Sequence, residues 1–493
     1  MSAKQFGHRL KQTIVVFLVA VGAVCLVGHG CKRSEPGGSP VAGGPNVLLI
    51  SLDTARADFF SCYGHERATT PRIDALASEG TLYRSAYATN FWTLPSHASL
   101  LTGLYPGQAG ATSETNHLPE AVTTLAERLG KAGYRTGAVV CNAWLSKANG
   151  FGQGFGDFVE MWRRRNAPMP NSTVAEVEQA AVDRAVSWMA RRAAERAPFF
   201  VFVNLNIAHL PYDPPSEWQA RFLSPRWAVD RISRLRGVTG MWPHLAGAIQ
   251  LSASDLRIMR ELYEAEIALA DDFAGQLVDA LKADGILDET LVIVTSDHGE
   301  NIGDHGMIDH LLSMYDSTIR VPLIIRYPDR FDAGVVIDDL VSLVDVAPTI
   351  LDVCGVSDEA SGRGDRPAGL CNQERAPRSF VLAENDRPMN GIDLLRKDFP
   401  SFDTSTIDHR MRMIRTRGHK LIWRVGAGVE LFDVRLDPGE LNDVADDRGS
   451  VREELLGELR RWSESTGRRE PPARFDGLDA ETLEQLRSLG YVE

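Results

Sequence analysis

Residues 291–310 read LVIVTSDHGENIGDHGMIDH, an apolar run followed at once by charged side chains. Residues 291–295 are largely β-branched, as expected of a strand buried on both faces of a parallel sheet. Asp297 and His298 follow directly, and open α/β sheets bind their ligands at the carboxyl ends of strands. Both residue types coordinate divalent metals, although a solvated turn has a similar composition. The stretch predicts an α/β fold with a candidate metal site at Asp297 and His298.

A second apolar run ends in the same way. Residues 46–53 read NVLLISLD and deliver Asp53 into a turn that begins with Thr54. Two acids and an imidazole from such distant strands converge on one cation only if the strands share a sheet, as they do in a doubly wound fold. We therefore expect Asp53, Asp297 and His298 to lie together.

A third stretch offers a nucleophile. Thr93 and Pro95 precede residues 96–103, SHASLLTG, which predict the start of a helix. The free backbone N–H groups of a helix start favour an anionic group, and a hydroxyl there is activated when a metal lowers its pKa. A simple N-cap role for Thr93 is the alternative.

Length and composition describe a globular chain. It has 493 residues, of which 44% are hydrophobic and 24% charged, and this length suggests one large catalytic domain and a smaller one. The formal net charge of -13 argues against a nucleic-acid partner, whose phosphates need a basic face. We found no signal for an oligomeric state.

The N-terminus reads as an export signal. Lys4, Arg9 and Lys11 precede an apolar run over residues 14–27 that is short for a membrane span. Cys31 comes next and is followed by a Gly, Ser and Pro linker, an arrangement that resembles a bacterial lipoprotein. We expect residues 1–31 to be a signal peptide or lipoprotein leader and residues 32–44 a linker. The protein would then be exported to the periplasm or cell envelope, with a membrane link only through the leader or a lipid on Cys31; simple cleavage and a retained anchor stay open.

In their order and spacing, the three stretches resemble the sulfatase family of the alkaline phosphatase superfamily. Members of that family carry a strand ending in a metal-binding Asp, then a Cys-or-Ser-x-Pro-Ser-Arg-x-x-x-Leu-Thr-Gly signature that holds the nucleophile, and later an Asp-His or Asp-Asn pair. Asp53, Thr93 and the pair Asp297 and His298 fall on these positions. Residues 430–433, ELFD, resemble the family's C-terminal subdomain.

The resemblance implies an alkaline-phosphatase-like, doubly wound mixed sheet with helices on both faces, plus a small C-terminal α+β subdomain with a short antiparallel sheet. The expected boundaries are 45–355 for the catalytic domain, 356–378 for a loop and 379–493 for the subdomain. The resemblance also implies one divalent metal, with calcium first by family and zinc or manganese favoured by imidazole ligation. Its expected ligands are Asp53, Thr93, Asp297 and His298.

The chain departs from the family at the nucleophile. It has Thr93 and His97 where the signature has Cys or Ser and Arg. Oxidation of threonine would give a ketone, so the formylglycine of true sulfatases is excluded. A threonine alkoxide attacks phosphorus directly in related phosphodiesterases, and we expect Thr93 to act in that way.

The remaining expected site residues are also carried over from the resemblance. His209 lies in a His-x-Pro-Tyr segment and His310 at the place of a family Lys, and both are candidates for binding the ester and for general acid catalysis. His97 and Asn142 are candidates for substrate binding. One metal is expected rather than two, with turn or surface roles for Asp213, Asp304 and His305.

The expected function is a metal-dependent, sulfatase-family hydrolase of sulfate or phosphate esters, acting on an anionic and perhaps glycan-linked substrate. A phosphodiesterase or phosphonate monoester hydrolase is the alternative, as is a phosphoryl-group transferase acting on cell-envelope material. A degenerate binding protein is disfavoured because all four expected metal ligands have metal-competent side chains.

Overall fold

The computed structural model describes residues 44–163, 172–238, 240–357, 370, 377–387, 389–465, 467 and 477–488. The expected leader and nearly all of the expected linker lie outside these residues. None of the helices within them has the length and apolar character needed to cross a membrane.

The main sheet has nine strands in the order β11, β2, β10, β6, β1, β5, β3 and β4, with β9 paired to β2. Strand β1 lies between β5 and β6 and is parallel to both. Strand β10 is antiparallel to β6 and to β2, which makes the sheet mixed. The bounds are β1 Asn46–Leu52, β2 Thr81–Tyr87, β3 Arg135–Val140, β4 Asp157–Glu160, β5 Phe199–Leu205, β6 Thr290–Thr295, β9 Arg320–Val321, β10 Leu323–Arg326 and β11 Val335–Ser342.

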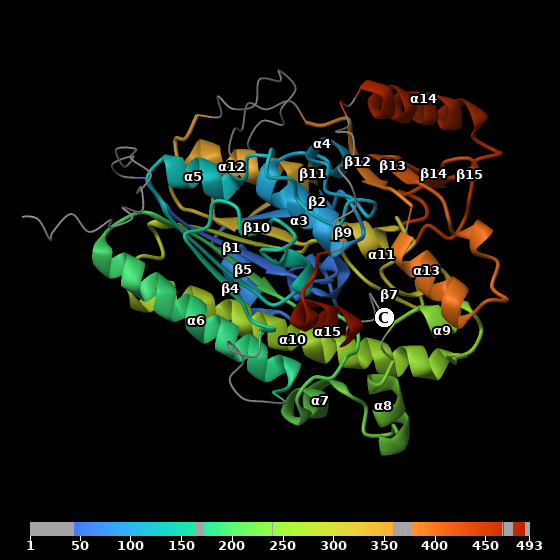
Figure 1. Cartoon of the computed structure of the whole chain (residues 1–493), viewed down its shortest axis with the longest axis horizontal. Helices are drawn as coiled ribbons and strands as arrows, with labels where there is room; N and C mark the ends of the chain where they lie inside the picture. Colours follow the sequence, from blue (N-terminus) through green and yellow to red (C-terminus); the bar gives the residue numbers. More distant parts are fainter. Residues whose placement is uncertain are drawn as a thin grey trace, which may run out of the picture. The chain divides into compact units, whose positions relative to one another are not determined.

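Helices cover both faces of this sheet. Figure 1 shows α6 (Val174–Glu195) and α10 (Ala253–Ala283) along one side, and α5 (Leu125–Lys131) and α12 (Val346–Val353) on the other. Alternate residues of β1 follow this division, because Val47 and Leu49 belong to one buried apolar cluster while Leu48 and Ile50 belong to the other. Burial on both faces explains why the central strands read as unbroken apolar runs.

The remaining helices are all shorter than α6 and α10. Their bounds are α2 Pro71–Ser78, α3 Thr93–Thr102, α4 Pro106–Ala109, α7 Ser216–Phe222, α8 Val229–Arg236, α9 Trp242–Leu245, α11 Asp316–Ile319, α13 Met389–Asp398, α14 Gly449–Ser465 and α15 Ala480–Ser488. A two-stranded hairpin of β7 (Asn301–Ile302) and β8 (Ile308–Asp309) follows β6.

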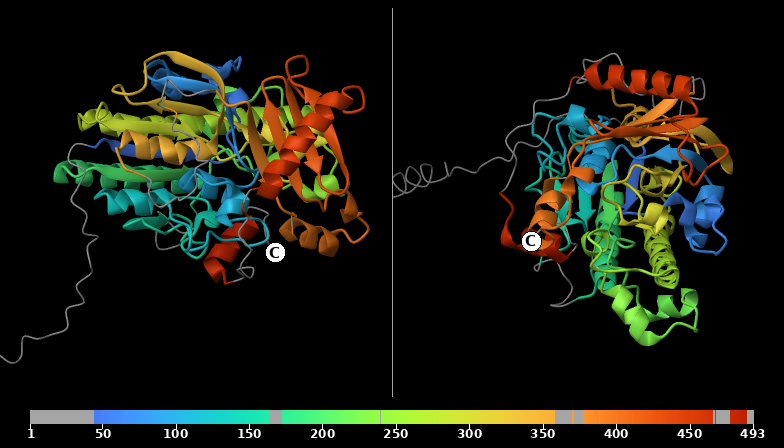
Figure 2. Two further views of the ribbon diagram at one scale, coloured as in Figure 1. Left: turned by 90° about the horizontal axis from the view of Figure 1, so that it is seen from above. Right: turned by 90° about the vertical axis from the view of Figure 1, so that its right-hand side faces the viewer.

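A second, antiparallel sheet of four strands lies beside the main one (Figure 2). Its strands are β12 Phe380–Asn385, β13 Met411–Thr416, β14 His419–Arg424 and β15 Gly428–Asp433. Helix α14 packs on it through Leu455, Leu456 and Leu459. Lys420 of β14 is fully buried and lies 2.7 Å from both Asp316 and Glu440, so this sheet is tied to the segment that follows the β7–β8 hairpin.

The predicted α/β fold with a doubly wound mixed sheet and a small C-terminal antiparallel sheet is confirmed. Residues 320–325, RVPLII, resemble a single strand of the sulfatase family in sequence, but this expectation is wrong because they belong to two strands. Pro322 has no N–H to donate, and the chain divides there into β9, which pairs with β2, and β10, which pairs with β6. The sequence also allows a disulfide between Cys354 and Cys371 in an oxidising compartment; Cys354 is buried, and Cys371 lies outside the described residues.

Candidate active site

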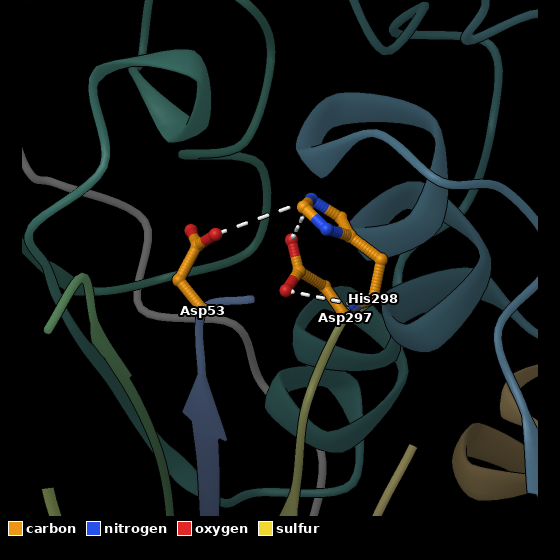
Figure 3. A group of neighbouring side chains, drawn as sticks. All are labelled: Asp53, Asp297 and His298. Atoms are coloured by element: carbon orange, nitrogen blue, oxygen red, sulfur yellow. Dashed lines mark hydrogen bonds and ion pairs between the residues drawn. The ribbon is translucent and has the colours of Figure 1, made fainter. Parts of the chain in front are cut away.

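Two neighbouring strand ends form the centre of the site. Ser51 of β1 is in register with Thr295 of β6, so the residues that follow these strands leave the same edge of the sheet. Figure 3 shows the side chains of Asp53, Asp297 and His298 directed toward one another. Nε2 of His298 lies 3.2 Å from Oδ2 of Asp297 and 4.0 Å from Oδ1 of Asp53. The three side chains are fully buried, as expected for groups held between two central strands.

The Thr93 hydroxyl faces this group. Thr93 is the first residue of α3, and its Oγ1 lies 3.3 Å from Nε2 of His298. The N-cap position belongs to Trp92, and no side chain caps the helix, so the alternative N-cap role for Thr93 is wrong. The hydroxyl is thus directed into the site and not back onto its own helix.

Asn142 holds one of the two acids in place. Its Nδ2 donates to Oδ2 of Asp53 at 2.8 Å and to Oδ1 of Asn206 at 3.0 Å. The same nitrogen lies 3.5 Å from Oγ1 of Thr93. Asn142, expected as a substrate ligand, therefore borders both Asp53 and Thr93.

Burial strongly perturbs the acids and the imidazole of the site. Burial and the neighbouring Asp297 raise the pKa of Asp53 to about 8, while burial lowers the pKa of His298 to about 3 despite the attraction of Asp297. Oδ1 of Asp53 and Oδ2 of Asp297 are buried and accept no hydrogen bond. Unsatisfied buried carboxylate oxygens are costly, and a divalent cation would satisfy both. The residues present therefore fit a metal, with Asp53, Asp297 and His298 offering ligand atoms within 4.8 Å of one another.

His97 lies behind the acids. Its Nδ1 donates to the carbonyl oxygen of Thr93 at 2.9 Å and lies 3.3 Å from Oδ2 of Asp297, while its Nε2 contacts Oγ of Ser51 at 2.9 Å. The imidazole is fully buried against Phe202. Its contacts suit it to orient Asp297, whereas our sequence-based prediction was substrate binding.

The other two histidines, His310 and His209, lie near His298. The ring of His310 lies 4.4 Å from that of His298 and 5.1 Å from that of His209, centre to centre. Burial and His310 lower the pKa of His209 to about 4. Burial alone would also lower the pKa of His310, but Asp309 and Glu300 outweigh it and raise that pKa to about 9.

Comparison with known protein families shows which family the chain belongs to. A family model described as Sulfatase matches residues 45–356, well over half of the chain. The chain belongs to the sulfatase family. A second model, N-sulphoglucosamine sulphohydrolase, C-terminal, matches residues 303–464. The protein is thus a sulfatase-family hydrolase, an enzyme acting on sulfuric or phosphoric esters.

Individual relatives of this sulfatase-family hydrolase are distant but cover most of it. Arylsulfatase K of Bos taurus is 27% identical over 458 residues, covering 84% of this chain and 81% of the relative. N-acetylglucosamine-6-O-sulfatase of Bacteroides thetaiotaomicron is 24% identical over 486 residues, covering 81% and 82%.

Solved structures share the fold. The phosphonate monoester hydrolase of Agrobacterium radiobacter matches with a TM-score of 0.67 at 24% identity, over 86% of this chain and 96% of that one. A protein solved in complex with its substrate D-glucosamine-2-N,6-O-disulfate matches with a TM-score of 0.69 at 21% identity, over 88% and 100%.

Two buried glutamates that sequence reasoning missed hold the His209 loop of this sulfatase-family hydrolase. Glu266 of α10 accepts the backbone N–H groups of Ala208 at 2.8 Å and Asp213 at 2.7 Å. Glu178 of α6 accepts the N–H of Asn206. Each glutamate lies on a helix that is distant from the loop in sequence. The available sequence signal is the position of each glutamate on the apolar, buried face of its helix.

Asp213, Asp304 and His305, the residues considered as ligands of a second metal, have other partners. Asp304 pairs with Arg56 and Arg260, Asp213 pairs with Arg236, and His305 stacks on Tyr315. Their contacts agree with the turn and surface roles that we expected.

Proposed function

We propose that this sulfatase-family hydrolase uses the unmodified Thr93 hydroxyl as its nucleophile on a sulfate or phosphate ester. The observation that carries the proposal is the position of Oγ1, 3.3 Å from Nε2 of His298. That nitrogen lies 3.2 Å from the unsatisfied Oδ2 of Asp297 and 4.0 Å from the unsatisfied Oδ1 of Asp53. A serine or cysteine at this position could be oxidised to an aldehyde, but threonine could not.

Four groups of this chain would hold one divalent cation: the carboxylates of Asp53 and Asp297, Nε2 of His298 and the Thr93 oxygen. When bound, the cation lowers the pKa of the hydroxyl and neutralises charge on the ester. Calcium is expected by family, whereas imidazole ligation favours zinc or manganese. Asn142 keeps Asp53 oriented through its 2.8 Å hydrogen bond, and His97 does the same for Asp297.

His209 and His310 would stabilise the ester oxygens and protonate the leaving group. The ring of His310 lies 4.4 Å from that of His298 and 5.1 Å from that of His209, so both imidazoles are near the expected metal ligand His298. Water would then release the acid half of the ester from Thr93.

The substrate class is also a proposal. The arylsulfatase and glucosamine-sulfatase relatives favour a sulfated, glycan-linked ester. Thr93 favours phosphorus esters, including phosphodiesters and phosphonate monoesters, because a threonine hydroxyl needs no oxidation to attack phosphorus. A phosphoryl-group transferase of the cell envelope uses the same nucleophile and is the remaining alternative.

For location, we propose export to the periplasm or cell envelope with a lipid on Cys31, based on residues 1–31. Metabolic labelling with radioactive palmitate should mark the wild type but not Cys31→Ala. Equal labelling of both would remove the lipid from the proposal. The domain boundaries 45–355, 356–378 and 379–493 likewise stay predictions.

A panel of 4-nitrophenyl esters tests the function. We expect turnover of phosphate, phosphonate or bis-phosphate esters by protein whose Thr93 peptide has an unmodified mass. Asp297→Asn should lose metal and turnover together, whereas Asp230→Asn, a change at an exposed acid of α8, should keep both. Turnover of the sulfate ester alone would mean that threonine serves a sulfatase. No turnover of any ester by metal-loaded protein would contradict the proposal.

A further inference from the structure

A second group of buried metal-competent side chains lies beside the first. Glu300, Asp309 and His310 offer ligand atoms that all lie within 4.8 Å of one another. Nδ1 of His310 lies 3.0 Å from Oδ1 of Asp309 and 3.3 Å from Oε1 of Glu300. Separations of about 3 Å between donor atoms equal the edges of a coordination shell whose bonds are about 2.1 Å long.

Charge is out of balance around the two groups. Asp53, Asp297, Glu300 and Asp309 are four buried carboxylates, and their ion pairs are all with histidines. Within the described part of the chain, no lysine or arginine forms an ion pair with any of the four. One divalent cation would compensate only two of these charges. An anionic ester entering such a site would meet net negative charge unless a second cation or protonated histidines supplied the rest.

Glu300 shows the imbalance most clearly. Its side chain is fully buried beside the hydroxyl of Tyr212, and neither that hydroxyl nor Oε2 of Glu300 has a hydrogen-bond partner of standard geometry among the described residues. The weak 3.3 Å contact of Oε1 with His310 is the closest approach of a cationic group. A buried carboxylate that lies beside a second carboxylate and an imidazole, with one oxygen lacking a hydrogen bond, is the arrangement expected around a cation.

Two backbone N–H groups orient the Asp309 carboxylate. Its Oδ1 accepts the N–H of His310 at 2.6 Å, and its Oδ2 accepts the N–H of Met241 at 3.2 Å. Each carboxylate oxygen can accept twice, so Oδ1 keeps a lone pair for a cation while the backbone fixes its direction.

We propose that Glu300, Asp309 and Nδ1 of His310 bind a second divalent cation, next to the one at Asp53, Asp297 and His298. Two carboxylates and one imidazole suit manganese or zinc better than calcium, which prefers six to eight oxygen ligands. The proposal concerns the metal content of the site and holds whichever ester is cleaved.

The second cation has a consequence for the histidines. With Nδ1 of His310 committed to a metal, the ring proton of His310 would lie on Nε2. Protonation of the leaving group then falls to His209, whose ring lies 5.1 Å away. The competing arrangement is a proton on Nδ1, which would make His310 an imidazolium between two carboxylates.

Metal counting on the full chain separates these arrangements. After chelation and reloading with Mn²⁺ alone, plasma mass spectrometry should find two manganese ions per wild-type chain. Electron paramagnetic resonance should show the signal of a spin-coupled pair. Glu300→Gln with Asp309→Asn should reduce the count to one and leave an uncoupled signal. The exposed control Asp230→Asn should keep two ions.

Each outcome bears on a different claim. One ion in the wild type that is lost in Asp297→Asn but kept in the double variant would refute the second site and leave the proposed function intact. An absence of bound manganese in the wild type would refute both. If the double variant fails to fold, as judged by its circular dichroism, the wild-type count and Asp309→Asn alone still decide the proposal.

Discussion

Replacing Thr93 by valine should separate catalysis from stability. The substitution removes one hydroxyl and keeps the branched shape of the side chain. That hydroxyl lies 3.3 Å from Nε2 of His298 and 3.5 Å from Nδ2 of Asn142, both long for a hydrogen bond. Its loss should therefore change the free energy of unfolding by about 1 kcal/mol or less. Loss of a nucleophile should reduce kcat by roughly 10⁴- to 10⁶-fold, or about 5 to 8 kcal/mol of activation free energy.

The assay compares wild type, Thr93→Val and Thr93→Ser in urea unfolding and in steady-state turnover of the preferred 4-nitrophenyl ester. Thr93→Ser keeps a hydroxyl and should retain measurable activity, with the mass of its peptide checked for oxidation. Thr93→Val that folds normally and keeps more than a tenth of the wild-type kcat would refute the nucleophilic role. A loss of several kcal/mol of stability would instead refute our assessment of the weak hydrogen bonds.

Three further outcomes are expected. Lys420→Met should lower the free energy of unfolding by about 3 kcal/mol, because it leaves the buried carboxylate of Glu440 and the partly buried one of Asp316 without their cation. The exposed Lys282→Met should leave urea unfolding unchanged. Burial raises the pKa of Glu266 to about 8, so its folded-state protonation adds stability that is present below its unfolded pKa and lost as pH rises through 8. The stability of wild type relative to Glu266→Gln should therefore fall between pH 5 and 8, and a constant difference would contradict the raised pKa. Chelation should lower the melting temperature and abolish turnover, since a metal at 100 times its Kd stabilises by about 2.7 kcal/mol; an unchanged melting curve in excess chelator would argue against a structural contribution from the metal.

The sequence was most informative where local pattern and chemistry coincide. The apolar runs that end in Asp53 and Asp297 predicted two buried strands and their meeting at one edge of the sheet. Both features depend on side-chain alternation and strand ends, which are local properties of the chain. The placement of Thr93 at a helix start was predictable for the same reason.

The rest of the site depends on contacts between distant segments. Glu300 meets Asp309 and His310 only because a hairpin of two-residue strands folds the chain back, and such short strands carry almost no periodic signal. Pro322 divides a run that looks like one strand, because it has no N–H to donate to a neighbouring strand. Both halves pair with β2, and only the second half also pairs with β6. Glu178 and Glu266 stand on long helices, where a charged residue normally indicates a solvent-facing side.

Side chains of helix α10 hold three separate segments around the site at fixed spacings. Along its 31 residues, Tyr263 bonds the turn after Asp53, Glu266 holds the loop of His209, and Asp271 accepts the first N–H groups of α2. One residue inserted between Tyr263 and Glu266 would rotate everything beyond it by about 100°. Tyr263 could then no longer make its hydrogen bonds at the same time as Glu266 and Asp271 make theirs. We therefore expect relatives that act on different substrates to differ in the loops around this helix, and to have no insertion between the residues that correspond to Tyr263 and Asp271.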